Sequence, residues 1–164
     1  MIDLQTIVYV IPLLAFSLSL IYYALNIRNA NISRKSQLTM NFYQTVTNRN
    51  FWDPWTNIVF QTEFTTFDEW SEKYSPTVNP KAAVDLYTVM QVFVGAGTLL
   101  KEGVIEPELL FNYLPQMIIP QSWTKIKPFV EGIRRRYNDP EFGIMFEYLY
   151  TESMRLNPNL IVPD

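Results

Sequence analysis

The sequence has no cysteine and no histidine among its 164 residues. It therefore cannot form a disulfide, and it lacks thiolate nucleophiles, imidazole bases and the His and Cys ligands that most transition-metal sites use. We accordingly expect no catalytic residue, no metal site and no cofactor. The net charge of −3 does not favour binding to nucleic acid, because nucleic-acid-binding surfaces are strongly basic.

Glycine is also scarce, with 5 residues, whereas aromatic residues make up 15% of the chain. This composition excludes a low-complexity or disordered body. The length is typical of a single domain.

Charge is missing from one long stretch near the N-terminus. Between Asp3 and Arg28 the residues are uncharged and mostly aliphatic or aromatic. A helix of ~20 residues crosses the ~30 Å hydrocarbon core of a bilayer, so this stretch is long enough to span a membrane. A cleaved signal peptide and a soluble core helix are the alternatives, but residues 1–6 lack the positive charge of a signal peptide. We predict a retained transmembrane anchor over residues 1–27 and a helical domain with an apolar C-terminal tail over residues 28–164.

The orientation follows from the charges that flank the predicted span. Arg28, Arg34 and Lys35 follow it, whereas only Asp3 precedes it. Positively charged flanks tend to stay in the cytoplasm. We therefore expect a single-pass protein of the cell membrane with a cytoplasmic body, in which these three basic residues contact lipid head groups.

The segment after the span indicates a continuing helix. From Arg28 to Asn50 the chain has no proline and no glycine, so the anchor helix should extend beyond the membrane. Asn29, Asn31 and Ser33 are the points where this helix could kink.

The rest of the chain contains a series of helix-start signals and few strand-like alternations. A capping residue or a proline at the first helical position marks each start. The predicted starts are Asp53-Pro54, Thr66 with Glu69 three residues later, Asn79-Pro80, Pro107 and Asp139-Pro140. The sequence thus predicts an all-α fold, in which one N-terminal transmembrane helix continues into a compact helical domain.

The apolar run over residues 82–100 has two interpretations. It could be a second membrane span, or it could be a central helix enclosed by others. Asp85 and Gln91 favour the central helix, because a carboxylate inside a span costs ~2.5–3.5 kcal/mol.

Two short motifs suggest chemistry and are better explained by structure. Ser122 and Lys125 have the S-x-x-K spacing of serine acylases, but the companion motifs are absent. Gly95 and Gly97 begin like a dinucleotide fingerprint, yet the third glycine is replaced by Leu100 and no strand precedes them. Small residues in a buried helix usually let a neighbouring helix approach closely.

Candidate contact residues fall into two groups. Small residues in the span, a surplus of aromatic residues and an apolar tail favour protein interfaces. Lipid contact, core packing and a tail folded back on its own domain are the respective alternatives. The candidates are Ala15, Ser17, Ser19, Trp52, Trp55, Trp70, Leu160, Ile161 and Val162. A basic helix can attract anionic lipid, although an ordinary charged face is the favoured interpretation of this stretch. The candidates for lipid contact are Lys125, Lys127, Arg134, Arg135 and Arg136.

Three segments carry a resemblance to a known family. They are VMQVFVGAGTLLKEGVIEPELLFNYL, SWTKIKPFVEGIRRRYNDPEF and FEYL. The sequence resembles a family of small bacterial and archaeal proteins with one N-terminal transmembrane helix and an all-helical body, a domain of unknown function. The matching positions are Gly103, Glu108, Leu109, Trp123, Pro128, Phe129, Arg134 and Asp139-Pro140. The resemblance implies the architecture and no reaction.

These observations lead to two main functional hypotheses, and an enzyme of unknown type comes third. The first is a non-catalytic accessory subunit of a larger membrane protein complex, with the bilayer and other membrane subunits as partners. The alternative is a membrane-tethered adaptor or sensor that binds lipid or protein through the basic helix.

Overall fold

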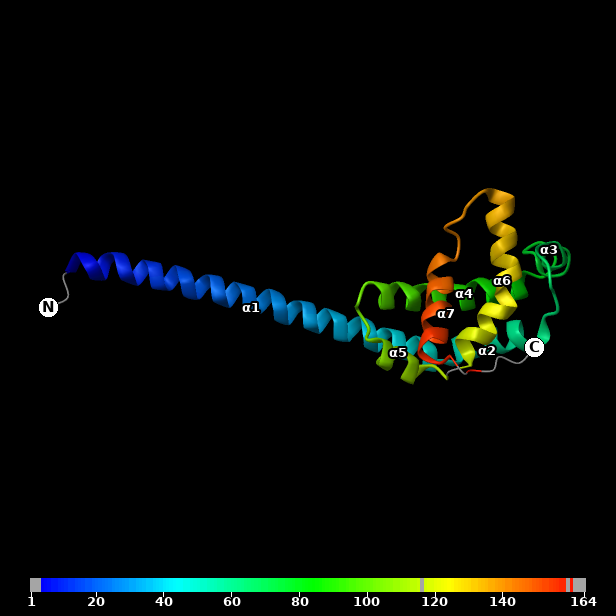
Figure 1. The fold of residues 1–164 in the computed structure, drawn as a ribbon, viewed down its shortest axis with the longest axis horizontal. Coiled ribbons are helices and arrows are strands. Elements are labelled where there is room, and N and C mark those ends of the chain that lie inside the picture. Colours follow the sequence, from blue (N-terminus) through cyan, green and yellow to red (C-terminus); the bar gives the residue numbers. More distant parts are fainter. Residues whose placement is uncertain (1–3, 116, 159, 161–164) are drawn as a thin grey trace. The chain divides into compact units, whose positions relative to one another are not determined.

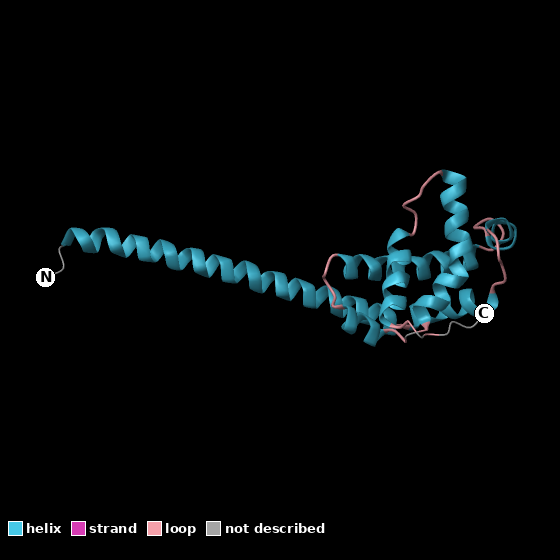
Figure 2. Cartoon of the chain, in the orientation of Figure 1, coloured by secondary structure: helices cyan, strands magenta, loops and turns pink. Residues whose placement is uncertain are grey.

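The computed structural model describes residues 4–115, 117–158 and 160, and the described residues contain helices and loops but no strand (Figures 1 and 2). The elements in chain order are α1 (Leu4–Thr47), α2 (Arg49–Thr56), a π-helical turn η1 (Asn57–Gln61), α3 (Phe67–Tyr74), α4 (Pro80–Lys101), α5 (Pro107–Tyr113), α6 (Ile118–Tyr137) and α7 (Ile144–Leu156). The predicted all-α fold is therefore confirmed.

The chain divides into two compact units, and the boundary falls inside α1. The first unit ends at Leu38 and the second, which we call the body, begins at Thr39. The anchor predicted over residues 1–27 ends where the chain should leave the membrane. This boundary differs from the boundary between the two units, and it stays a prediction.

The N-terminal part of α1 is a continuous apolar surface. From Val8 to Ile27 its large apolar side chains are between 44% and 76% exposed. The hydroxyls of Ser17 and Ser19 donate to the carbonyls of Leu13 and Ala15, both at 2.8 Å, so neither serine leaves an unpaired donor on this surface. The helix runs without interruption past the predicted weak points at residues 29–33.

The body is built around α4. This helix contacts α2, η1, α3, α5, α6 and α7, and the side chains of Leu86, Val89, Phe93 and Ala96 are fully buried. The apolar run over residues 82–100 thus forms the central helix of the body. Among the described residues, α4 and the stretch of α1 from Val8 are the helices long and apolar enough to cross a membrane, and only α4 is substantially buried within the chain.

Two glycines let helices of the body approach closely. A Cβ added at Gly97 of α4 would lie 2.0 Å from the carbonyl oxygen of Met145 in α7. A Cβ at Gly132 of α6 would lie 2.1 Å from the Cβ of Phe67 in α3. At Gly95, by contrast, an added Cβ would meet nothing within 4 Å, so close packing explains Gly97 but not Gly95.

Three of the five predicted helix starts are confirmed. Thr66 caps α3 by accepting a hydrogen bond from the backbone N–H of Glu69 at 3.2 Å. Asn79 caps α4 through Ala82 at 3.1 Å, and Pro107 is the first residue of α5. Thr66 and Asn79 each accept a hydrogen bond from a free backbone N–H of the first turn. Pro107 stands at a position where no N–H donor is needed, as the sequence indicated.

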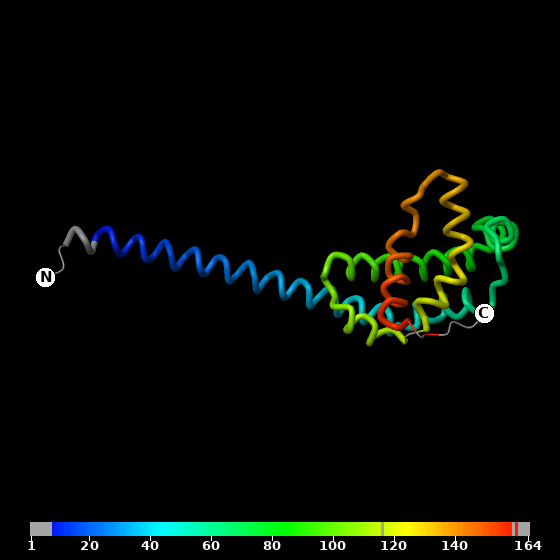
Figure 3. Tube along the Cα trace, in the orientation of Figure 1, coloured from blue at the N-terminus to red at the C-terminus, as the bar shows by residue number. Residues whose placement is uncertain are grey.

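The other two predicted starts are wrong. Pro54 lies inside α2, because Asn48 caps that helix earlier by accepting from the N–H of Asn50 at 2.8 Å. The Asp139-Pro140 pair lies in the turn between α6 and α7, bounded by left-handed residues at Asn138 and Gly143. That turn reverses the chain, so that α6 and α7 run in opposite directions (Figure 3).

Candidate functional site

The predicted contact residues of the span lie on the exposed surface of α1. Ala15, Ser17 and Ser19 are all exposed. Ala15 and Ser19 are one turn apart on the same face of the helix, whereas Ser17 lies on the opposite side. The surface available to another helix is thus the pair Ala15 and Ser19, flanked by large apolar side chains.

Two of the three candidate tryptophans are core residues, which corrects their assignment to an interface. Trp55 is 8% exposed and Trp70 is 4% exposed. The indole N–H of Trp55 donates to Ser122 Oγ at 2.8 Å, and the ring of Trp70 packs edge-on against Phe129 at 4.4 Å. The body is large enough to enclose both rings, whereas Trp52 is half-buried and remains an interface candidate.

The apolar tail is described at one of its three candidate residues. Leu160 is half-buried, and its backbone N–H donates to the carbonyl of Asn157 at 3.1 Å. Ile161 and Val162 lie outside the described residues, so their predicted docking stays a prediction.

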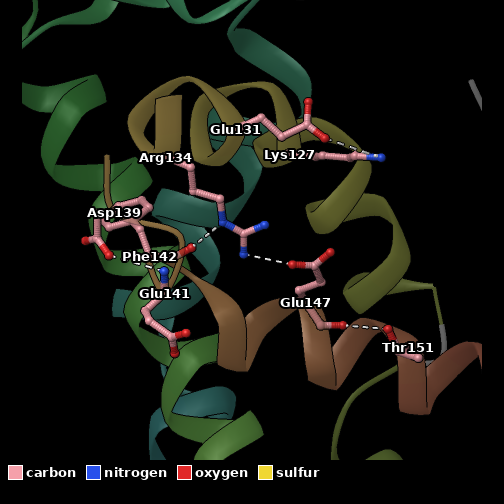
Figure 4. A network of polar contacts seen from close by, with 8 residues as sticks. All are labelled: Lys127, Glu131, Arg134, Asp139, Glu141, Phe142, Glu147 and Thr151. Carbon is pink, nitrogen blue, oxygen red and sulfur yellow. Dashed lines mark hydrogen bonds and ion pairs between the residues drawn. The ribbon is translucent and has the colours of Figure 1, made fainter. Parts of the chain in front are cut away.

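Arg134 serves the body rather than a lipid surface, which corrects its assignment as a head-group contact. Its Nη2 lies 2.8 Å from Glu147 Oε2, and its Nε donates to the carbonyl oxygen of Phe142 at 2.9 Å (Figure 4). These contacts join the end of α6 to α7 across the turn that connects them. The side chain is 21% exposed, so little of its charge reaches the surface.

The remaining basic residues of α6 do not form one uniform cationic face. Lys127 lies 3.6 Å from Glu131 Oε1, and the guanidinium of Arg136 lies over the ring of Phe67. Arg135 lines a shallow cleft together with Lys127 and Glu131. Near the predicted span, Arg28, Arg34 and Lys35 are exposed on α1, and their contact with lipid head groups stays a prediction.

Lys125 occupies an environment unlike that of the other basic residues. Its ammonium donates to the carbonyl of Thr62 and lies 5.0 Å from the centre of the Phe64 ring. Burial lowers the pKa of Lys125, although the nearby Glu63 carboxylate opposes that shift. Sequence reasoning placed Lys125 on an open basic face and missed this setting, because the contact with Thr62 joins residues 63 positions apart.

The S-x-x-K spacing does not create a reactive serine. Ser122 is fully buried, and its hydroxyl donates to the carbonyl of Ile118 at 2.6 Å while accepting from Trp55. Lys125 points to Thr62 instead. Within the described part of the chain, no group of three or more acidic side chains is arranged to hold a metal ion.

Taken together, the fold defines an all-helical protein whose N-terminal helix is long and apolar enough to span a membrane. The model of a family described as a domain of unknown function (DUF4760) matches residues 13–153. That match covers most of the chain, and the protein belongs to this family. No curated protein and no solved structure matches the chain.

Proposed function

We propose that this protein is a non-catalytic accessory subunit of a larger membrane protein complex, held in the cell membrane by α1. The observation that carries the proposal is the exposed apolar surface from Val8 to Ile27, where every large apolar side chain is at least 44% exposed. Exposed apolar area of this extent is unfavourable in water at ~25 cal/mol per Å². A bilayer together with a neighbouring transmembrane helix would cover it.

The orientation that we propose places the body in the cytoplasm. Arg28, Arg34 and Lys35 are exposed at the end of the apolar surface, where they can reach lipid head groups. Basic residues that flank a span are retained on the cytoplasmic side.

The contact with a partner subunit within the membrane would use Ala15 and Ser19. Small side chains let two helix backbones approach closely, and close packing drives helix association in lipid, where no hydrophobic effect operates between helices. On the body, Trp52 is the remaining candidate among the tryptophans, because it is only half-buried.

A tethered adaptor or sensor is the second candidate function. The basic helix α6 gives this function little support, because it presents no uniform cationic face. Arg134 pairs with Glu147, and Lys127 pairs with Glu131. The observation that favours it is the setting of Lys125.

The test is native mass spectrometry of the protein purified in mild detergent from its source cells. We expect one species of defined stoichiometry that contains this chain and other membrane subunits. The double substitution Ala15→Leu with Ser19→Leu should release the chain from that species. The two leucines prevent the close approach of another helix at this face, and α1 stays at least as apolar as before. Leu13→Phe, on the opposite side of α1, is the matched control, and it should leave the species intact. A wild-type protein that is monomeric, under conditions that preserve other membrane complexes, would contradict the accessory-subunit proposal.

A further inference from the structure

Lys125 is a half-buried cation that forms no ion pair in the described part of the chain, and Glu63 acts on it only from a longer distance. Among the described residues, no carboxylate lies within 4.0 Å of its Nζ. The ammonium has three N–H donors, and the structure gives it one acceptor, the carbonyl of Thr62, together with the face of the Phe64 ring. The structure thus gives the ammonium fewer acceptors than it has donors, and an anionic group in the adjoining cleft can accept the remaining N–H bonds.

The ammonium lies at a cleft that is lined by apolar and polar residues in equal number. The cleft encloses about 390 Å³, and its lining residues are Val59, Phe60, Phe64, Thr65, Gln121, Thr124, Lys125 and Pro128. This volume falls in the range of ~300–1,000 Å³ typical of small-molecule sites. Lys125 is the one charged residue in the lining, so the cleft combines one positive charge with an extended apolar surface.

The π-helical turn η1 shapes one wall of the cleft. It carries Val59 and Phe60, and Phe60 is 62% exposed although its ring packs edge-on against Trp55 at 5.4 Å. A π-helical turn is a rare element that occurs frequently at functional sites. Here it holds a large aromatic side chain partly in solvent, in the same cleft lining as the Lys125 ammonium.

We propose that this cleft binds an amphiphilic anion, with its carboxylate or phosphate group on Lys125 and its apolar chain along Phe60, Val59 and Pro128. The head group supplies the acceptor oxygens that the ammonium lacks, and a hydrogen bond between two charged groups is stronger than one between neutral groups. The apolar chain removes the exposed part of Phe60 from water. This binding activity is independent of the accessory-subunit proposal, because it requires neither α1 nor a partner subunit.

Isothermal titration calorimetry with octanoate tests the proposal on the full chain, reconstituted in phosphatidylcholine nanodiscs with empty nanodiscs as the blank. We expect saturable binding of octanoate, and binding of octanol that is weaker by roughly tenfold or more. Lys125→Met keeps the side-chain length, removes the charge and should weaken octanoate to the level of octanol. Lys127→Met is the matched control on the same helix, and it should leave the octanoate affinity unchanged.

A second variant keeps the test decisive if Lys125→Met fails to fold. Phe60→Ala removes an exposed ring and retains the charge, so the body should stay folded while octanoate binds several-fold more weakly. The proposal is overturned if octanoate does not saturate, if octanol binds equally well, or if both Lys125→Met and Phe60→Ala bind octanoate like the wild type.

The source of the anion is distinguished by a competing titrant. Soluble dihexanoyl phosphatidylglycerol, added below its micelle concentration, should displace octanoate if the site takes a lipid head group. If octanoate is not displaced while its binding still requires Lys125, the ligand is a free amphiphilic carboxylate.

Discussion

The two long apolar helices of this protein, α1 and α4, have opposite environments. The large apolar side chains of α1 from Val8 to Ile27 are exposed, whereas those on the inner side of α4 are buried by the other helices of the body. Apolar content alone therefore does not separate an exposed helix from a core helix. The two helices differ in residues that require a packed protein partner, such as a buried charge or a glycine in close contact with another helix. Helix α4 contains such residues, whereas the apolar part of α1 contains none.

Asp85 and Gly97 are the clearest of these residues. The Asp85 carboxylate is 9% exposed, and it accepts hydrogen bonds from Lys81 Nζ at 2.6 Å and from Asn57 Nδ2 at 2.5 Å. Gly97 allows the backbone of α7 to lie against α4. A charge that is paired within the body and a glycine that a neighbour covers both mark a helix that packs against protein.

The largest expected difference between the two helices comes from truncating a leucine in each. Leu86→Ala should lower the free energy of unfolding of the body by ~2–5 kcal/mol, because it leaves a cavity in a fully packed core. Leu18→Ala should leave it unchanged, since Leu18 is 66% exposed and lies outside the body.

Tryptophan fluorescence in urea measures this difference directly. All 4 tryptophans lie in the body, so their emission follows the unfolding of the body and not that of the apolar segment. Equal shifts of the urea midpoint in the two variants would contradict the assignment of separate environments.

The two glycines of α4 provide the second comparison. Gly97→Ala should destabilise the body by ~1–3 kcal/mol or more, because the added Cβ collides with the backbone of α7. Gly95→Ala should stabilise it by up to ~1 kcal/mol, since alanine is the better helix former and the site is open. The urea midpoints of the two variants should move in opposite directions, and a shift of the same sign in both would show that α4 and α7 are not packed as described.

The cap of α3 should contribute less than either core feature. Thr66→Ala removes the acceptor for the N–H of Glu69, and a lost cap of this type costs ~1 kcal/mol. The matched control is Thr77→Ala, in the loop that follows α3, which removes no cap. A Thr66→Ala protein as stable as the Thr77→Ala protein would contradict the capping role.

The charge of Glu69 should give the smallest effect, and one that depends on pH. The N–H and hydroxyl of Thr65 bond to the Glu69 carboxylate and hold its pKa below the ordinary value of 4.5. A lowered carboxyl pKa stabilises the fold above the ordinary pKa, and this stabilisation is lost as the pH falls through the folded-state pKa. Glu69→Gln should therefore reduce the urea midpoint at pH 7, and the difference from wild type should shrink on acidification below the ordinary pKa. A difference that stays constant with pH would exclude the ionised carboxylate as its cause.

The local elements of this fold could be predicted where one residue decides the outcome. Thr66, Asn79 and Pro107 act within one turn of their own helices, and the sequence located all three. Asp53-Pro54 misled the prediction because Asn48 caps the same helix five residues earlier. Nothing in the sequence ranks one cap above another when both are available.

The candidate site is formed by contacts between residues that are distant in the sequence, so it could not be predicted from local patterns as the helix starts were. Lys125 meets Thr62, and Trp55 meets Ser122, across 63 and 67 residues respectively. The sequence identified these residue types as notable, but their burial is set by how α6 packs against η1. The π-helical turn also has no sequence signal, so the exposure of Phe60 was missed.

We propose that a bilayer covers the apolar surface of α1 while the body lies in the cytoplasm. The natural chain has no cysteine, so a single introduced cysteine is the only thiol that a maleimide can label. We therefore compare Ser19→Cys, within the apolar surface, with Ser36→Cys and Thr77→Cys, all in the full chain in intact cells and in inverted membrane vesicles. A membrane-impermeant maleimide should leave Ser19→Cys unlabelled in both preparations, and it should label the other two only in inverted vesicles. Labelling of Ser19→Cys as fast as Ser36→Cys would contradict the anchor, and labelling of Thr77→Cys in intact cells would contradict the cytoplasmic body.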